Sequence, residues 1–413
     1  MAEPTATPRP RALVVADSDS YLKWAVRRAE DLRDAYDVEV VVVRNAVTPS
    51  TAQRAAAIDG RLDTDPGEIG LRALAARLRA ERPALLLLAC RGPLIELLLL
   101  EELRGERAAD VVVAGIPGIW FPPTALGLRL RAACDVMVVH SEREREAVTA
   151  MLADLPADAR LAHLGLASLL EDQEVGGADR PRIVFAPQAL VPARREDRVA
   201  LLDALVDVAR AHPELDVVIK LRGTAGEAQT HEEADGFEQL AAGREVPGNL
   251  VFAHGALREY LGDCAGFVTV SSTAALEAIA ADVPVLVVDE FGVSAQMINL
   301  VFEGSGLFGG LDDLRALRFR APATAWMDAN YFQAEGDWVA VAQEAAGASA
   351  PGATMRDPHA GLMRSPQRLR RRSVALGAGD DSWHGPALAP LRAALAAYDR
   401  LQRRRRGSQG NRG

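Results

Sequence analysis

The feature that most constrains the fold is a regular alternation of short apolar strands with helical stretches along most of the chain. This order is typical of βαβ units, which build parallel sheets covered by helices. In the first half the apolar runs predict strands at 12–16, 38–43, 84–89, 111–115, 136–140 and 161–164. A second set is predicted at 183–186, 217–221, 250–253, 267–270 and 285–288. We therefore expect an α/β protein with two Rossmann-like domains that face a cleft.

A polar, glycine-containing stretch separates the two sets of strands and predicts a linker. The strand rhythm is lost after about residue 319, where Ala, Gly, Pro and Arg become frequent and a C-terminal helical extension is expected. The expected organisation is a disordered N-terminus at 1–10, an N-terminal acceptor domain at 11–170, a linker at 171–181, a C-terminal nucleotide-donor domain at 182–320, an irregular, mobile segment at 321–389, an amphipathic docking helix at 390–405 and a disordered tail at 406–413.

The composition fits a globular protein and argues against nucleic acid as a partner. A chain of 413 residues that is 49% hydrophobic can bury two ordinary cores. Its net charge of -10 does not provide the basic face that a phosphate backbone requires. Arginines do cluster at 368–372 and at 403–406. We interpret both clusters as a solvated tail, with peripheral attraction to an anionic membrane surface as the functional alternative.

The sequence predicts a cytoplasmic protein, with the inner face of the plasma membrane as a further location. The first eleven residues are polar and proline-rich, unlike a signal peptide. The leucine-rich segment 83–100 contains Arg91 and Glu96, which are costly in a bilayer, and so predicts no transmembrane segment. The three cysteines lack metal-ligand spacing and are expected to be reduced thiols: Cys90, Cys134 and Cys264.

The most informative stretch is 267–292, where a β-branched strand stops at three hydroxyls and turns into a helix. Ser271, Ser272 and Thr273 stand at this turn, and the following strand ends at Asp289. Helix starts bind anions, and ligands of open parallel sheets gather at the carboxyl ends of strands. The pattern predicts a phosphate site, whereas the simpler interpretation is a well-capped crossover helix.

A second anion-binding group is predicted at the end of strand 217–221, which delivers Lys220 and Arg222 to a flexible loop. The chain contains only two lysines, and Lys220 is one of them. Two cations there suit a diphosphate or nucleotide whose charge grows as it leaves. Glu277, on the helix that follows Thr273, could reach a ribose hydroxyl or bond to nearby backbone. The alternative for the cations is a solvated surface loop.

The first predicted strand runs into Asp17, Ser18, Asp19 and Ser20. A carboxylate at this strand end would face the cleft, so Asp17 or Asp19 is the candidate general base for an acceptor hydroxyl. A plain helix cap is the simpler interpretation. Acidic pairs after a strand also begin phosphohydrolases of the haloacid dehalogenase type, but Tyr21 departs from that pattern.

The loop after strand 111–115 is the candidate acceptor side. Gly115 and Gly118 would let the backbone approach a ligand, and Trp120 offers an apolar face for a sugar ring. His140 ends the next strand and joins this set, although a lone histidine there is more often structural. A packed interdomain loop is the alternative.

Residues 183–311 resemble bacterial glycosyltransferases of GT-B fold, through the segments VTVSSTAALEA, KLRGTAGEAQTHEE and VDEFGVSAQMINLVFEGSGLFGGL. The resemblance is to glycosyltransferases of GC-rich bacteria and, more distantly, to capsule, polysialyl and teichoic-acid-type transferases. It implies that the hydroxyls at 271–273 hold a donor phosphate, with no metal. Polysialyl-type relatives carry a His-Pro pair where this chain has Lys220-Leu221-Arg222, which transfers leaving-group stabilisation to the cations.

The leading hypothesis is a metal-independent inverting glycosyltransferase without a cofactor. It would move a sugar from a nucleotide-activated donor, such as a CMP-nonulosonic acid, to a hydroxyl of a cell-surface polysaccharide or cell-wall glycopolymer. A catalytically idle GT-B-like scaffold that binds a sugar or polymer is the alternative from another class. A nucleotide-sugar epimerase is the third hypothesis.

Overall fold

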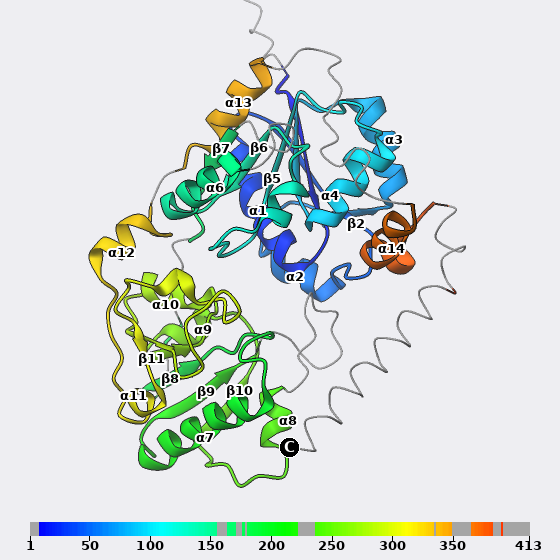
Figure 1. Ribbon diagram of the computed structural model, residues 1–413. Helices are drawn as coiled ribbons and strands as arrows, with labels where there is room; N and C mark the ends of the chain where they lie inside the picture. The colour runs from blue at the N-terminus through cyan, green and yellow to red at the C-terminus, as the bar shows by residue number, and fades with distance from the viewer. Residues whose placement is uncertain are drawn as a thin grey trace, which may run out of the picture.

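The computed structural model describes residues 8–154, 163–170, 176–177, 180–221, 236–333, 336–348, 365–382 and 390. These residues form two parallel sheets, each flanked by helices, as Figure 1 shows. Every strand pair within the two sheets is parallel. The expected α/β architecture of two Rossmann-like domains is confirmed.

The N-terminal sheet has seven strands in the order β3-β2-β1-β4-β5-β6-β7. The strands are β1 (Arg11–Ala16), β2 (Asp37–Val43), β3 (Gly67–Ile69), β4 (Leu85–Ala89), β5 (Val111–Gly115), β6 (Val136–Val139) and β7 (His163–Leu166). Between them lie α1 (Asp19–Leu32), α2 (Thr51–Ile58), α3 (Leu71–Glu81), α4 (Gly92–Glu96), a π-helical turn at Leu97–Glu102, α5 (Ala125–Arg129) and α6 (Glu142–Asp154). The central strands are apolar throughout because helices cover both faces.

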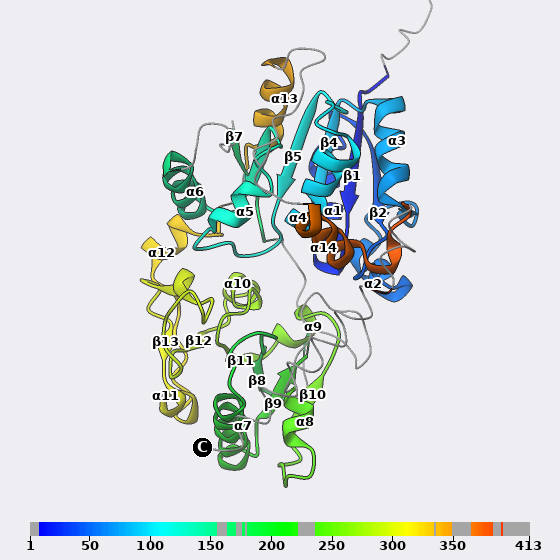
Figure 2. The ribbon, with the colours of Figure 1, turned by 45° about the vertical axis from the view of Figure 1, so that its right-hand side comes forward.

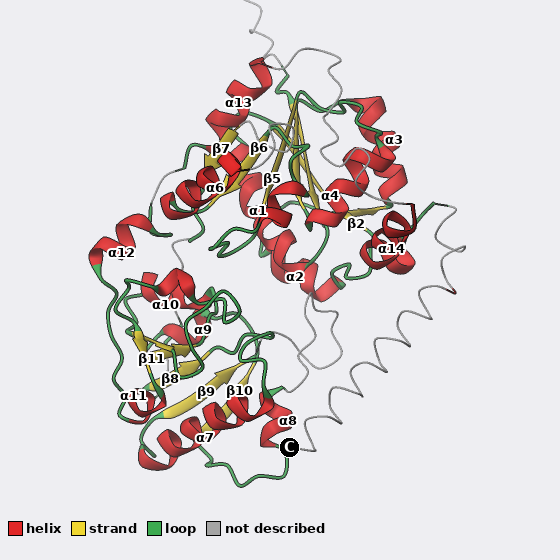
Figure 3. Cartoon of the chain, viewed as in Figure 1, coloured by secondary structure: helices red, strands yellow, loops and turns green. Residues whose placement is uncertain are grey.

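The C-terminal sheet has six strands in the order β10-β9-β8-β11-β12-β13. The strands are β8 (Arg182–Phe185), β9 (Asp216–Lys220), β10 (Leu250–Ala253), β11 (Cys264–Thr269), β12 (Val285–Val288) and β13 (Phe308–Gly309). The helices are α7 (Arg195–Ala211), α8 (Phe237–Ala241), α9 (Arg258–Leu261), α10 (Ala274–Ala280) and α11 (Leu311–Arg315), with a short 3₁₀ turn at Leu300–Phe302 (Figure 3). The sequence did not predict β3 and β13, because strands this short carry no apolar run.

The expectation of an irregular segment at 321–389 is wrong for much of its length. The structure contains α12 (Thr324–Ala329), α13 (Trp338–Ala348), α14 (Ser365–Leu376) and a 3₁₀ turn at Gly377–Gly379. After the C-terminal domain the chain returns to the N-terminal one, where α13 lies beside β7 (Figures 1 and 2). Trp338 and Ala342 of α13 are buried in the N-terminal core, and the Trp338 indole donates to Asp31 at 2.8 Å. Tertiary burial stabilises a helix whose composition suggested a loop.

Helix α14 docks on the N-terminal domain, which corrects the interpretation of its arginines as a solvated tail. Arg372 is only 3% exposed. It makes two 2.9 Å bonds to Asp380 and one of 2.6 Å to Glu102. Arg371 pairs with Glu96. Buried arginines need such partners, so these charges hold the helix in place.

Some expectations fall outside the described residues. The side chain of Arg368 and the cluster at 403–406 do so, as does the predicted docking helix at 390–405 apart from residue 390. The leucine-rich segment 83–100 forms β4, α4 and part of the π-helical turn. Across the described ranges, no helix has the length and apolar character needed to cross a membrane.

Candidate functional site

Each sheet has one point where its strand order reverses, and ligands of open parallel sheets bind at such points. In the N-terminal sheet the reversal lies between β1 and β4, and in the C-terminal sheet it lies between β8 and β11. Helix α10, which follows β11, lies on the side of its domain nearest the N-terminal domain (Figure 2). The loops at these two points are therefore the candidate site.

The reversal point of the C-terminal sheet is built around hydroxyl groups. Thr269 Oγ1 donates to the carbonyl of Ala186 at 2.9 Å and accepts from the Ser272 amide at 3.0 Å, which joins the loops after β8 and β11. Ser272 Oγ accepts from the Ala274 amide at 3.3 Å, so this hydroxyl serves as a helix cap. Ser271 is 6% exposed, and its Oγ has no hydrogen-bond partner within the described chain. An unpartnered buried hydroxyl calls for a ligand or an ordered water.

The loop between β8 and α7 also belongs to this reversal point, and sequence reasoning missed it. Arg198, 3% exposed, donates to the carbonyls of Gln188, Ala189 and Pro192 at 3.1, 2.7 and 2.8 Å. The Gln188 side chain in turn accepts from the Leu190 amide. A buried guanidinium thus fixes the backbone beside Ser271. Arg198 lies in the first turn of α7, and nothing in the local sequence indicated that its side chain would be buried.

The other predicted donor residues follow β9 and β12 or lie on α10. Lys220 ends β9 and is half-buried. Because β8 separates β9 from β11, their ends lie roughly 10 Å apart, so Lys220 and Ser271 would contact different parts of a ligand. Asp289 follows β12, and Glu277 lies one turn beyond Thr273 on α10; both are half-buried. Arg222 lies outside the described residues.

The reversal point of the N-terminal sheet holds a buried ion pair. Asp17 Oδ2 accepts from Arg91 Nε at 2.7 Å and from the Arg91 amide at 3.1 Å. Arg91 Nη2 also donates to Asn45 Oδ1 at 2.8 Å. Burial raises the pKa of Asp17, against the opposing effect of Arg91. In the sequence Arg91 was interpreted only as an interruption of an apolar run, although it lies two residues after the end of β4.

Three buried oxygens lack partners in this one turn, as far as the structure describes the chain: Asp17 Oδ1, Ser18 Oγ and Asp19 Oδ1. Asp17 is completely buried, whereas the Asp19 side chain is 29% exposed and accepts from Lys23 Nζ at 2.9 Å. Of the two predicted bases, only Asp19 can meet a substrate without rearrangement of the fold.

The loop after β5 brings the domains together. Gly118 has φ +80°, and a Cβ built on it would lie 3.3 Å from Thr273 Oγ1 of the other domain. Only glycine combines that conformation with so close an approach. Trp120 is half-buried, and its amide donates to Glu144 at 2.7 Å. Gly115 has a different role from the predicted one, because a Cβ there would clash with the Trp24 ring.

His140 lies in the core, which corrects its assignment to the acceptor side. It is 1% exposed. Its Nε2 accepts from the Trp24 indole at 2.8 Å, and its Nδ1 donates to the carbonyl of Ala167 at 3.0 Å. Burial lowers the pKa of His140 to about 3. The ring is therefore neutral, and both of its nitrogens have partners within the core.

Two further residues of the interdomain region went unnoticed in the run HSEREREAV. Glu144, 1% exposed, accepts from the amides of Trp120 and His140 and from the Tyr331 hydroxyl at 2.6 Å. Arg143 stacks 4.1 Å from the Phe121 ring centre and donates to the carbonyl of Val301 at 2.8 Å. Together they fix the loop after β5 against the C-terminal domain. In the sequence, the alternating acidic and basic residues of this run are typical of a solvent-exposed helix, so neither residue was singled out.

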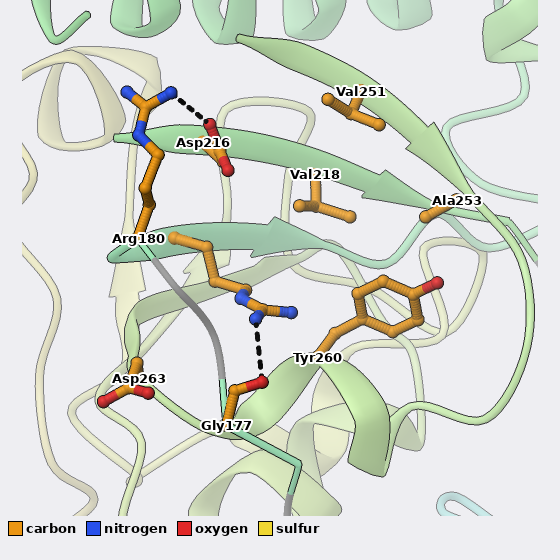
Figure 4. A pocket seen from close by; sticks show the side chains of 9 residues that line it. Gly177, Arg180, Asp216, Val218, Val251, Ala253, Tyr260 and Asp263 are labelled. Atoms are coloured by element: carbon orange, nitrogen blue, oxygen red, sulfur yellow. Dashed lines mark hydrogen bonds and ion pairs between the residues drawn. The ribbon is translucent and has the colours of Figure 1, made fainter. Parts of the chain in front are cut away.

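A hollow of about 690 Å³ lies on one face of the C-terminal sheet (Figure 4). It runs along the sheet from Arg182 and Asp216, the first residues of β8 and β9, to Ala253 at the end of β10. Asp216 pairs with Arg180 at 3.2 Å, and Arg182 donates to the carbonyls of Gly177 and Glu259. These charged side chains bond to other residues of the protein, so we do not assign the donor site to this hollow. Within the ranges described, no group of three metal-binding side chains converges.

Comparison with known proteins agrees with this architecture. The family described as "Putative glycosyltransferase (DUF6716)" matches residues 12–345. No curated protein matches the sequence. The fold is similar to that of S. aureus MnaA solved with UDP, with a TM-score of 0.52 and 10% identity over 88% of this chain and 97% of that one.

A second similar structure is a UDP-glucosyltransferase from Polygonum tinctorium, solved in a complex with 3,4-dichloroaniline. Its TM-score is 0.50, with 13% identity over 84% of this chain and all of the other. Identities this low establish the fold alone. The family match spans most of the chain, so the protein belongs to the family described as "Putative glycosyltransferase (DUF6716)" and has the two-domain GT-B fold.

Proposed function

We propose that the protein transfers a glycosyl group from a nucleotide-activated sugar to an acceptor hydroxyl, with the donor phosphate in the crevice between β8 and β11. The acceptor binds at the reversal point between β1 and β4. Saccharides of cell-surface polysaccharide or cell-wall glycopolymer are the acceptor class, and CMP-nonulosonic acids are one donor class to test. The transfer needs no metal ion and inverts the anomeric centre.

One observation carries this proposal: unpartnered buried oxygens occur at both reversal points. Ser271 Oγ lies at one, and Asp17 Oδ1, Ser18 Oγ and Asp19 Oδ1 lie at the other. A buried polar atom without a partner costs about 1 to 3 kcal/mol. Two such places, one in each domain, fit a reaction that joins two polar substrates across the domains. Gly118 beside Thr273 brings the two loops into contact.

The chemistry follows from the accessibility of the groups. The acceptor oxygen forms a bond to the anomeric carbon while its proton passes to the Asp19 carboxylate. The bond from the anomeric carbon to the phosphate oxygen breaks, and its electron pair leaves with the nucleotide. Ser271 donates to that phosphate, and the Lys220 ammonium faces the charge that develops on it. Asp17 acts as a positioning residue, because its buried carboxylate pairs with Arg91 at 2.7 Å.

Nucleotide binding tests the donor site directly. CMP, CDP, UDP and GDP are titrated in a thermal-shift assay, where a ligand at a hundredfold its Kd stabilises by about 2.7 kcal/mol. We expect one of them to bind, and Ser271→Ala to weaken it by roughly 10- to 100-fold through loss of a hydrogen bond to a charged group. Ser373→Ala is the matched control, because Ser373 is also buried with an unpartnered Oγ but lies on α14.

The outcomes separate the alternatives. Equal affinity of the Ser271→Ala and Ser373→Ala variants would remove Ser271 from the donor site. The absence of a thermal shift with all four nucleotides would favour the non-catalytic scaffold. Nucleotide binding followed by release of free sugar without any acceptor would favour the epimerase.

A further inference from the structure

A pocket of about 340 Å³ lies between α4 and α14, beside the reversal point of the N-terminal sheet. Its apolar lining comes from two neighbouring residues on each helix, Pro93 with Leu94 and Val374 with Ala375. Arginines complete the lining: Arg91, Arg370 and Arg371. The volume lies within the range of small-molecule sites, about 300 to 1,000 Å³.

The three arginines leave a surplus of positive charge at this pocket. Arg91 pairs with Asp17, and Arg371 pairs with Glu96. Arg370 is exposed and has no ion-pair partner within the described residues, nor does any hydrogen bond there occupy Arg91 Nη1. Guanidinium groups bind phosphate well because their N–H groups match its oxygens. The lining thus offers one unpaired cation and one further donor to an anion.

The apolar part of the pocket is exposed and fixed in position. Val374 is 63% exposed, the largest exposure among the large apolar side chains of the described chain. Helix α14 is held by the buried Arg372 pairs with Asp380 and Glu102, and the Asp381 carboxylate accepts from the Arg72 and Ala73 amides at the start of α3. A pocket formed before binding loses less entropy when a ligand enters.

We infer that this pocket binds an amphiphilic anion, an apolar chain that carries a phosphate. The chain packs on Leu94 and Val374, and the phosphate contacts Arg370 and Arg91 Nη1. Arg91 also holds Asp17, two residues before Asp19, so a bound phosphate lies beside the turn proposed for acceptor activation. The inference rests on the proposed function in one respect: it makes the acceptor a saccharide carried on a lipid phosphate.

The test uses n-octyl phosphate, titrated calorimetrically into the full chain below the concentration at which it forms micelles. We expect saturable binding, with octanol and inorganic phosphate each at least roughly tenfold weaker. The double variant Arg370→Ala, Val374→Asn should raise the Kd by roughly tenfold or more. The control is Leu126→Asn, Arg129→Ala on α5, where an exposed leucine and arginine also share a helix but lie outside this pocket. It should bind like the wild type.

Three results would overturn the inference. The first is equal affinity of the two double variants. The second is inorganic phosphate as tight as octyl phosphate, which would leave a plain anion site. The third is binding to phosphatidylglycerol vesicles without binding of monomeric octyl phosphate, which would make α14 a membrane contact. Nucleotide binding at Ser271 is measured separately, so a wild-type protein that binds a nucleotide but not octyl phosphate would refute this pocket and not the donor site.

Discussion

Replacing His140 by Ala should destabilise the protein strongly at neutral pH, because the ring satisfies two buried groups. Without it, the Trp24 indole N–H and the Ala167 carbonyl lose their partners at 2.8 and 3.0 Å. Each unsatisfied buried group costs about 1 to 3 kcal/mol. The expected loss at pH 7 is therefore about 2 to 6 kcal/mol in the free energy of unfolding. His163→Ala, at an exposed position, is the control and should change stability little.

The stability contribution of His140 should also depend on pH, and its direction follows from the pKa shift. The pKa of His140 is about 3 in the fold, below its ordinary value of 6.5, because burial disfavours the charged ring. The unfolded chain therefore binds the extra proton between these values. The stability contribution of His140 is fully present above pH 6.5 and is lost as pH falls toward 3. The loss is about 1.4 kcal/mol for each pH unit, or roughly 2 kcal/mol at pH 5.

Urea denaturation of the wild type and of His140→Ala at pH 7 and pH 5 measures this effect. Other groups titrate in both proteins, so their contributions cancel in the difference between them. We expect the cost of the substitution to shrink by roughly 2 kcal/mol between pH 7 and pH 5. An unchanged cost would refute the buried neutral ring. Loss of transfer activity with normal stability would return His140 to the acceptor site.

Three further predictions concern the proposed chemistry and the docking of α14. Asp19→Asn should lower turnover by about 10²- to 10⁴-fold with unchanged nucleotide affinity, and full activity in a transfer assay would exclude Asp19 as the base. Lys220→Ala should lower kcat, and wild-type activity should persist in excess chelator; a loss that Mg²⁺ reverses would point to a metal ion instead. Arg372→Ala should cost about 3 to 5 kcal/mol in urea denaturation, because it leaves buried carboxylates unpaired, whereas Arg370→Ala should stay within about 0.5 kcal/mol. Equal effects of these two substitutions would mean that α14 is not anchored through Arg372.

The candidate site could be predicted from the sequence where strand ends supplied it. Ser271 and Asp19 were proposed because polar residues closely follow apolar strands, and parallel strands bring such positions to one edge of a sheet. The sequence could not tell that the Ser272 hydroxyl would cap α10 while the Ser271 hydroxyl would lack a partner. The two serines are chemically identical, and only the path of the backbone distinguishes them.

Arg91 and Asp17 show why much of the remaining site stayed hidden. Their 2.7 Å contact joins residues from two strands that are neighbours in the sheet but far apart in the chain. Pairing of this kind depends on strand order, which periodicity does not report. The same holds for Glu144 and Tyr331, which meet only after the chain has passed through the whole C-terminal domain.

The sequence by itself determined the alternation of strands and helices, because apolar runs of strand length and helical periodicity are local properties. It also determined the division into two parallel sheets. The tertiary structure decided the return of α13 to the first domain, the docking of α14 and the burial of His140. Each of these depends on contacts between distant segments. Arg372 is charged and would be expected at the surface, but in the folded chain it is buried with Asp380 as its partner. Ala342 is buried because α13 packs on the N-terminal core, a contact that local sequence does not report.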